Sequence, residues 1–203
     1  MSLTKITAKI HKPMWDAFKK QTESLFLKRV AFFDYIINTE TRYLAQELAG
    51  KQQSFKANRY IAGMLKKADA HQVSISVKRE TSVALQKVVD ETNMVRDAFI
   101  NRLIMLLRGS KWLLNHLDVP KELDMRHFSG AELMPSSPMQ AMEAVRDDPL
   151  FYLRTRVESD GGSGLYLFPL PTKLHGFSCY LDDEDVPNTV ANKKKTAEVE
   201  SWL

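Results

Sequence analysis

Apolar and polar residues alternate strictly along residues 4–12. Ile6, Ala8 and Ile10 share one face, and Lys5, Thr7, Lys9 and His11 share the other. A period of two residues is typical of a strand with one buried face, so this stretch is predicted to be a strand. Pro13 follows and suits the first turn of a helix, where its missing N–H would have no partner in any case.

Two helical patterns follow this strand. A short helix is predicted over residues 14–24, where the apolar residues at helical spacing are Met14, Ala17 and Phe18. A second helix is predicted over residues 28–48, on Ala31, Tyr35, Leu44 and Leu48. Gly50 is well suited to end that helix. The predicted order of elements is therefore strand, helix, helix.

The same order returns about 67 residues later along the chain. Residues 72–78 alternate again, with one face made by Val73, Ile75 and Val77 and the other by Gln72, Ser74, Ser76 and Lys78. Helices are predicted over residues 82–91 and 95–107, separated by a turn at Asn93, because asparagine tolerates a positive φ angle. A further helix is predicted over residues 54–68, between the two copies. This internal repeat is the main evidence for the architecture.

A single strand of this length cannot be stable by itself, because both of its edges would be unpaired. We expect the two strands to pair antiparallel and the helices of both copies to cover their apolar face. The predicted fold class is mainly α with a short two-stranded antiparallel ribbon, plus a small α+β region. Residues 1–110 are predicted to form the first domain, and residues 111–203 a small acidic accessory region with a flexible tail.

Charge is distributed unevenly between these two parts. Residues 1–110 hold 19 Lys and Arg against 10 Asp and Glu, a net charge of +9. Residues 111–203 hold 10 Lys and Arg against 15 Asp and Glu, a net charge of −5. The basic first part is suited to a polyanionic partner such as nucleic acid, and the acidic second part is not.

The repeated unit resembles the ribbon-helix-helix superfamily of Arc- and MetJ-like DNA-binding proteins. Residues 5–10 (KITAKI) are similar to a family ribbon strand, and residues 91–100 (ETNMVRDAFI) are similar to the turn and the start of the second helix. The resemblance covers residues 3–49 and 71–108. Members usually supply one copy per chain and dimerise, so two copies in one chain imply a covalent pseudo-dimer that binds double-stranded DNA in the major groove.

The resemblance implies base contacts from three alternating outward positions on each strand. In this sequence those positions are Lys5, Thr7 and Lys9 in the first strand and Gln72, Ser74 and Ser76 in the second. Lysine can donate to guanine N7 and O6, glutamine can bond adenine at two atoms, and hydroxyl groups adapt to either base. Because the two sets of side chains differ, we expect the preferred DNA site to be asymmetric.

The resemblance also implies phosphate contacts at the start of each second helix, where free N–H groups attract anions. The matching residues are Lys28, Arg29 and Arg96. The sequence departs from the family pattern here, because Leu27 and Val95 stand where a small polar capping residue is usual. Asp97 would in addition repel phosphate from the second of these helices.

Residues 111–203 carry fewer signals. Helices are predicted over residues 111–117 and 139–145, and short strands over residues 165–170 and 176–181 that could form a hairpin. The glycine-rich run at residues 160–164 lacks the spacing and the lysine of a phosphate-binding loop and is interpreted as a flexible turn. The acidic run at residues 182–185 is interpreted as a solvated loop, and Lys193, Lys194 and Lys195 as a frayed tail.

No catalytic residue, metal site or cofactor is predicted, and we do not expect an enzyme. Cys179 is the single cysteine, and the histidines of the second half form no ligand pair. The longest apolar run, residues 103–107, is far too short to span a membrane, and the N-terminus lacks the apolar core of a signal peptide. We expect a cytoplasmic protein with no membrane partner.

Two functional hypotheses remain open at this point. The first is a sequence-specific DNA-binding protein, acting in transcription regulation as a repressor or as an accessory factor of a plasmid or other mobile element, with self-association of chains on DNA. The alternative is an antitoxin-like interaction module that captures a protein partner through residues 111–203.

Overall fold

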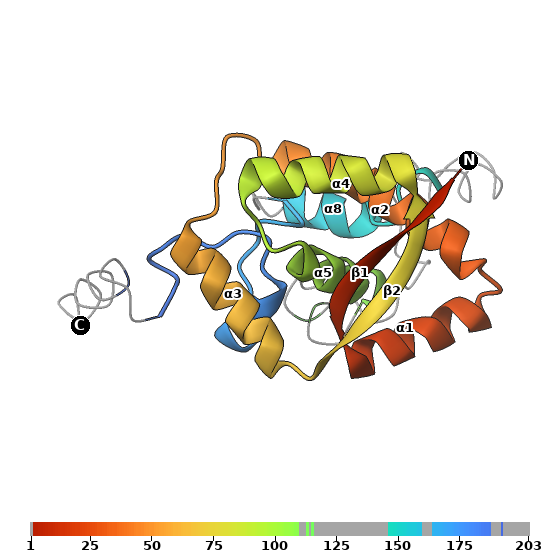
Figure 1. The fold of residues 1–203 in the computed structure, drawn as a ribbon, viewed down its shortest axis with the longest axis horizontal. Coiled ribbons are helices and arrows are strands. Elements are labelled where there is room, and N and C mark those ends of the chain that lie inside the picture. The colour runs from red at the N-terminus through yellow and green to blue at the C-terminus, as the bar shows by residue number, and fades with distance from the viewer. Residues whose placement is uncertain are drawn as a thin grey trace. The chain divides into compact units, whose positions relative to one another are not determined.

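The computed structural model describes residues 2–109, 113, 115, 146–159, 164–187 and 192. These residues, whose fold is drawn in Figure 1, divide by their contacts into two compact units, one of Met1–Ile104 with Tyr166–Leu203 and one of Met105–Leu165. The ribbon and the residues predicted to contact DNA all belong to the first unit. In the second unit, helix α8 (Phe151–Ser159) is preceded by Asp148, whose carboxylate pairs with Arg154 at 3.2 Å.

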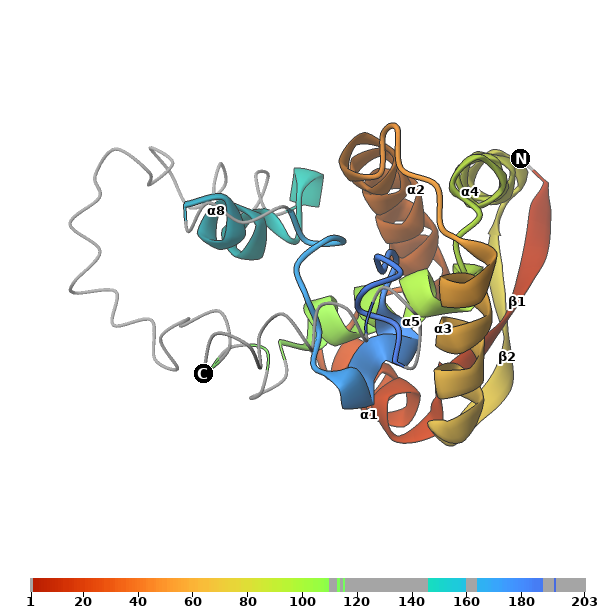
Figure 2. The same ribbon diagram turned by 90° about the vertical axis from the view of Figure 1, so that its left-hand side faces the viewer.

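The two predicted strands pair with each other in one antiparallel sheet. Strand β1 (Leu3–His11) lies beside β2 (Ala70–Lys78), with Ile6 opposite Ile75 and Thr7 opposite Ser74. The inward face is apolar, with Ile6, Ala8, Ile10, Ile75 and Val77 buried. Figure 2 shows the described helices of this unit on one side of the ribbon, so none of them covers its other face.

Each strand leads into two helices, as the sequence predicts. The first copy continues into α1 (Lys12–Ser24) and α2 (Arg29–Glu47), and the second into α4 (Arg79–Thr92) and α5 (Arg96–Arg108). The connecting helix is α3 (Phe55–Lys67), whose first turn is capped by Ser54 through a 3.1 Å bond from the N–H of Ala57 to its hydroxyl. The predicted mainly α fold with a short two-stranded antiparallel ribbon is confirmed. A strand pair followed by helices is also the arrangement that the resemblance implies.

Apolar faces of the helices close over the inward side of the ribbon. Phe18 of α1 lies 5.3 Å from Phe33 of α2 between ring centroids, and both side chains are buried. The corresponding core of the second copy includes Leu85 of α4 and Ile100 of α5, neither of which is exposed. Burial of side chains of this size supplies most of the stabilisation, at about 1.5–3 kcal/mol each.

The predicted hairpin of residues 165–170 and 176–181 is wrong. Residues 164–171 form turns and irregular backbone, and residues 172–177 form a 3-10 helix, η1 (Thr172–Phe177). Pro169 and Pro171 interrupt the apolar run, and proline has no N–H to give to a strand ladder. The alternation of apolar residues here reflects packing against helices and not strand pairing.

Residues 166–187 pack against α3 and the residues that immediately precede it. The side-chain amide of Gln53 bonds both backbone groups of Leu181, donating to its carbonyl at 3.3 Å and accepting from its N–H at 3.1 Å. Gly176 lies so close to α3 that a β-carbon there would be 2.9 Å from the backbone nitrogen of Leu65. The hydroxyl oxygen of Tyr60 also lies 3.2 Å from Nδ1 of His175. Burial lowers the pKa of His175.

A buried polar network joins the same segment to α2 and α5. Glu40 accepts from the hydroxyl of Tyr166, and Glu47 from its backbone N–H, each at 2.6 Å. Arg102 is fully buried, donates to the carbonyl of Phe168 at 2.8 Å and lies 4.2 Å from the centre of that ring. Burial lowers the pKa of Arg102. Residues 166–187 are therefore part of the ribbon-containing unit, whereas we expected all of residues 111–203 to form a separate region.

Several predictions for the second half lie outside the described residues. They are the helix over residues 139–145, most of the helix over residues 111–117, the glycine-rich turn before Gly164 and the basic run Lys193–Lys195.

A charge on the inward face of the ribbon should unfold this unit. Ile75 is 5% exposed and lies opposite Ile6. Ile75→Lys would bury an unpaired ammonium group and should lower the free energy of unfolding by about 3–5 kcal/mol. Ser74→Lys places the same charge one residue away on the exposed face and should leave the thermal midpoint nearly unchanged. Equal midpoints for the two variants, measured by circular dichroism, would contradict the assigned register.

The turn between α1 and α2 holds a strained residue. Phe26 has a φ of 56° and is 95% exposed, whereas the matching residue of the second copy, Asn93, has a φ of 52°. A β-carbon in this region costs about 1–2 kcal/mol, and asparagine offsets part of that cost. Phe26→Asn should therefore raise the free energy of unfolding by about 1 kcal/mol. Phe26→Ala keeps the β-carbon and should give no such gain in the same denaturation experiment.

Candidate nucleic-acid interface

The six outward side chains of the ribbon form three cross-strand pairs. Lys5 lies opposite Ser76, Thr7 opposite Ser74 and Lys9 opposite Gln72. Five of the six are exposed and Ser76 is partly buried. Successive pairs are about 6.6–6.8 Å apart along the strands, and the strands themselves are about 4.8 Å apart. The result is a narrow patch of hydrogen-bonding side chains that contains two lysines and no carboxylate.

An approximate two-fold axis passes through the centre of this patch. The register places Thr7 opposite Ser74, which is the residue 67 positions further along and therefore its equivalent in the second copy. The same offset of 67 residues makes Lys5 equivalent to Gln72 and Lys9 equivalent to Ser76. The backbone is thus nearly symmetric, while the outward side chains are not.

Helices from the opposite copy complete the outer edges of the ribbon. Near the end of β1, the N–H of His11 donates to the side-chain oxygen of Asn101 at 2.9 Å. At the end of β2, the N–H of Lys78 donates to the carboxylate of Asp34 at 2.6 Å. His11 and Lys78 are 67 residues apart, as are Asp34 and Asn101, so the two contacts are equivalent. They fix the ribbon firmly on α2 and α5.

Asn101 does more for its strand than Asp34 can. Its side-chain nitrogen donates to the carbonyl of Lys9 at 2.8 Å and to that of Asp97 at 2.7 Å. The carboxylate of Asp97 in turn accepts from the backbone N–H of Lys9 at 3.1 Å. Asp97, which the sequence suggests as a residue that repels phosphate, therefore has a structural role at the ribbon edge.

The three predicted phosphate-contacting residues lie at the two helix starts. Lys28 is exposed and occupies the capping position of α2 without a side-chain bond to the helix. Arg29 begins α2, and its guanidinium lies 3.6 Å from the carboxylate of Glu23. Arg96 begins α5 and donates to the carbonyl of Thr7 at 2.5 Å. The first helix start therefore offers two exposed cations, whereas the arginine of the second is bound to the ribbon.

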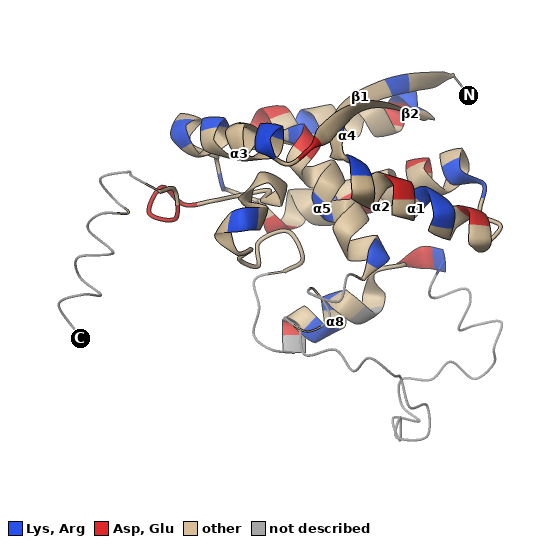
Figure 3. Ribbon diagram, turned by 90° about the horizontal axis from the view of Figure 1, so that it is seen from below, with Lys and Arg blue, Asp and Glu red and all other residues tan. Residues whose placement is uncertain are grey.

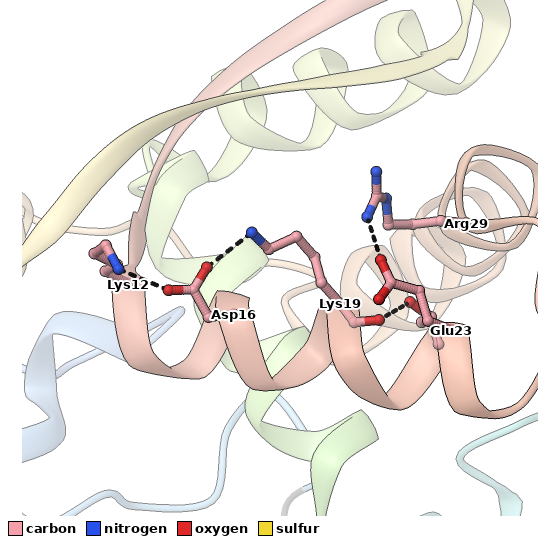
Figure 4. A network of polar contacts seen from close by, with 6 residues as sticks. Lys12, Asp16, Lys19, Glu23 and Arg29 are labelled. Carbon is pink, nitrogen blue, oxygen red and sulfur yellow. Dashed lines mark hydrogen bonds and ion pairs between the residues drawn. The ribbon is translucent and has the colours of Figure 1, made fainter.

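Charges along α1 are largely paired with one another (Figure 4). Asp16 lies 2.8 Å from both Lys12 and Lys19, and hydrogen bonds from these two lysines lower the pKa of Asp16 to about 2. Figure 3 shows where the basic and acidic residues of the ribbon and helices lie. The structure thus distinguishes neutralised cations on α1 from the lysines of the ribbon face. The spacing of Asp16 four residues after Lys12 and three before Lys19 is a sequence signal for the pairing on α1.

Comparison of the chain with models of known protein families, with curated proteins and with solved structures finds no significant match. Among the described helices, none combines the length and the apolar character that a membrane span needs. The assignment of base and phosphate contacts stays a prediction that rests on geometry and chemistry.

Two single substitutions, each placing the residue of one edge at the other, should test the unequal roles of Asn101 and Asp34. Asn101→Asp keeps the acceptor for His11 but loses both donated bonds and places a buried carboxylate against two carbonyls, so unfolding should become easier by about 3 kcal/mol. The loss should shrink as the pH falls, because a protonated carboxyl group regains a donor. Asp34→Asn keeps its acceptor and should cost about 1 kcal/mol or less. Similar thermal midpoints for both variants at neutral pH would argue against this account.

Proposed function

We propose that this chain is a sequence-specific protein that binds double-stranded DNA, reading the major groove with a ribbon built from two tandem ribbon-helix-helix units. The observation that carries the proposal is the exposed ribbon face. It holds three cross-strand pairs of hydrogen-bonding side chains, while the opposite face is part of the core. A two-stranded ribbon fits the major groove, where each base pair presents a distinct pattern of donors and acceptors.

Different side chains at the two ends of the ribbon would read different bases. At one end Lys5 stands beside Ser76, and at the other Lys9 stands beside Gln72. The lysines suit guanine, Gln72 suits adenine, and the central hydroxyl pair of Thr7 and Ser74 adapts to several bases. A site without two-fold symmetry follows from this arrangement, although the ribbon backbone is nearly symmetric.

Anchoring on the DNA backbone would be stronger on the side of the first copy. A ribbon in the major groove brings the starts of α2 and α5 towards the two flanking phosphate backbones. The start of α2 presents Lys28 and also Arg29, whose guanidinium lies 3.6 Å from the exposed carboxylate of Glu23. Arg96 of α5, by contrast, is occupied by the carbonyl of Thr7. Phosphate contacts position a protein on DNA and carry no sequence information, so this inequality affects affinity and orientation more than base preference.

A repressor, or an accessory factor of a plasmid or other mobile element, is the role that such binding supports best. We rank an antitoxin-like module second. That hypothesis needs residues 111–203 as a free capture surface, yet residues 166–187 are packed against α2, α3 and α5 through contacts such as those of Glu40, Tyr60 and Arg102.

Substitutions on the ribbon face should separate reading from folding. With a duplex selected from a random pool by the full-length protein, Lys9→Ala and Gln72→Ala should each weaken binding by about 1–3 kcal/mol and relax the preference at one or two base pairs. Their thermal midpoints should be nearly unchanged, because both side chains are exposed.

Arg29→Ala is the matched phosphate-contact control for this experiment. It should weaken binding to all sequences about equally and make the dependence of affinity on salt shallower. Should Lys9→Ala and Gln72→Ala bind the selected duplex as tightly as the parent with the same preference, the ribbon is not the reading surface. The interaction-module hypothesis would then take precedence.

A further inference from the structure

Helix α3 carries a basic face that the ribbon-reading function does not use. Its exposed cations are Lys56, Arg59, Lys66 and Lys67, and it contains no acidic residue. At 100° per residue these four lie on the side opposite the buried Ala57, Ile61 and Leu65. The helix thus turns its apolar face to the core and two pairs of positive charges, one near its start and one at its end, to solvent.

These four cations are not neutralised within the described part of the chain. None of them forms an ion pair with a described carboxylate, and Arg59 only lies over the ring of Phe55 at 4.9 Å. Some lysines of α1 and α4, by contrast, are paired. Lys12 and Lys19 of α1 share Asp16 at 2.8 Å, and Lys87 of α4 pairs with Glu91 at 3.8 Å. Unneutralised charge concentrated on one helix raises the local concentration of a polyanion.

The position of α3 places this charge beside one end of the ribbon. The helix ends at Lys67, and β2 begins at Ala70, opposite His11. This is the end at which Lys9 and Gln72 form the outermost outward pair. Figures 2 and 3 both show α3 next to β2, and Figure 3 shows basic positions along the exposed length of α3.

The helix is also held rigidly enough to act as a fixed surface. Asn58 donates to the carbonyl of Asn93 at 2.7 Å, which ties the start of α3 to the turn before α5. Its buried side packs in one apolar cluster with Ala98, Leu181 and Val186. A fixed basic surface loses less conformational entropy on binding than a flexible basic tail.

We propose that the exposed face of α3 is a second DNA-binding surface, which contacts phosphates of the duplex beyond the Lys9–Gln72 end of the ribbon. This inference rests on the proposed function, because the ribbon sets where the duplex lies. The contacts are to the backbone and do not depend on base sequence. They extend the footprint on one side only, since α3 occurs once, between the two copies.

The test uses the full-length protein, a duplex selected from a random pool and a scrambled duplex of equal length. Two double variants, Lys56→Gln with Arg59→Gln and Lys66→Gln with Lys67→Gln, each remove two positive charges. Each should weaken binding to both duplexes by a similar factor. The slope of log affinity against log salt should become shallower by about 0.9 for each phosphate that the variant no longer neutralises. Hydroxyl-radical footprinting should show reduced backbone protection beyond one end of the site and unchanged protection at its centre.

Lys19→Gln with Lys87→Gln is the matched control. It removes the same charge from two exposed helices, at lysines that already have carboxylate partners. It should change the salt slope and the footprint less than either α3 variant. Circular dichroism melts verify that all variants fold. If one of the two α3 double variants does not fold, the other one alone is used for the test.

The outcomes separate the two proposals. If the parent protein selects no sequence and binds no duplex, the proposed function fails and this inference fails with it. If the parent binds its site but both α3 variants keep its affinity, salt slope and footprint, α3 is not a DNA-binding surface and the ribbon function stands. If the control loses as much affinity as the α3 variants, the effect is one of total charge and the localisation to α3 is overturned.

Discussion

The ribbon depends on hydrogen bonds between each strand and a helix of the other copy. Two strands satisfy only the edge that they share, and the outer edges need other partners. Asn101 of the second copy serves β1, and Asp34 of the first copy serves β2. The copies are therefore interlocked, because neither can complete its own strand. This constraint keeps the exposed face of the ribbon fixed relative to the helix starts beside it.

A nearly symmetric scaffold carries an asymmetric surface. Asp34 and Asn101, which hold the scaffold together at the ribbon edges, both accept a hydrogen bond from a strand N–H. Equivalent positions that face solvent differ more, as Lys9 and Ser76 show on the ribbon and Phe26 and Asn93 show in the turns. Helix α3 adds a further asymmetry, since it packs beside β2 and the second copy's turn. The two ends of the ribbon face are therefore chemically distinct.

Most of the ribbon and its helices could be predicted from the sequence, because local periodicity determines them. The alternation around Ile6 and Ile75 gives the strands and their buried face, and the 67-residue repeat implies that the strands pair. Contacts between distant residues leave no such local signal. The hydrogen bonds of Asp97 and Arg96 to β1 join residues about 90 positions apart, so the sequence alone suggested roles at phosphate for both. Pro169 and Pro171 were the available sequence signal against the predicted hairpin. No sequence signal indicated that Arg102 and Glu40 are buried.

Joining both strands in one chain also changes how the protein responds to its own abundance. A ribbon made from two separate chains disappears at low copy number, because its assembly depends on the square of the chain concentration. Here the partner strand is always present in the same molecule, since β1 and β2 belong to one polypeptide. A single molecule per cell would therefore carry a complete ribbon. On the function that we propose, occupancy of a DNA site would rise in direct proportion to expression at low dose, without a threshold set by dimerisation.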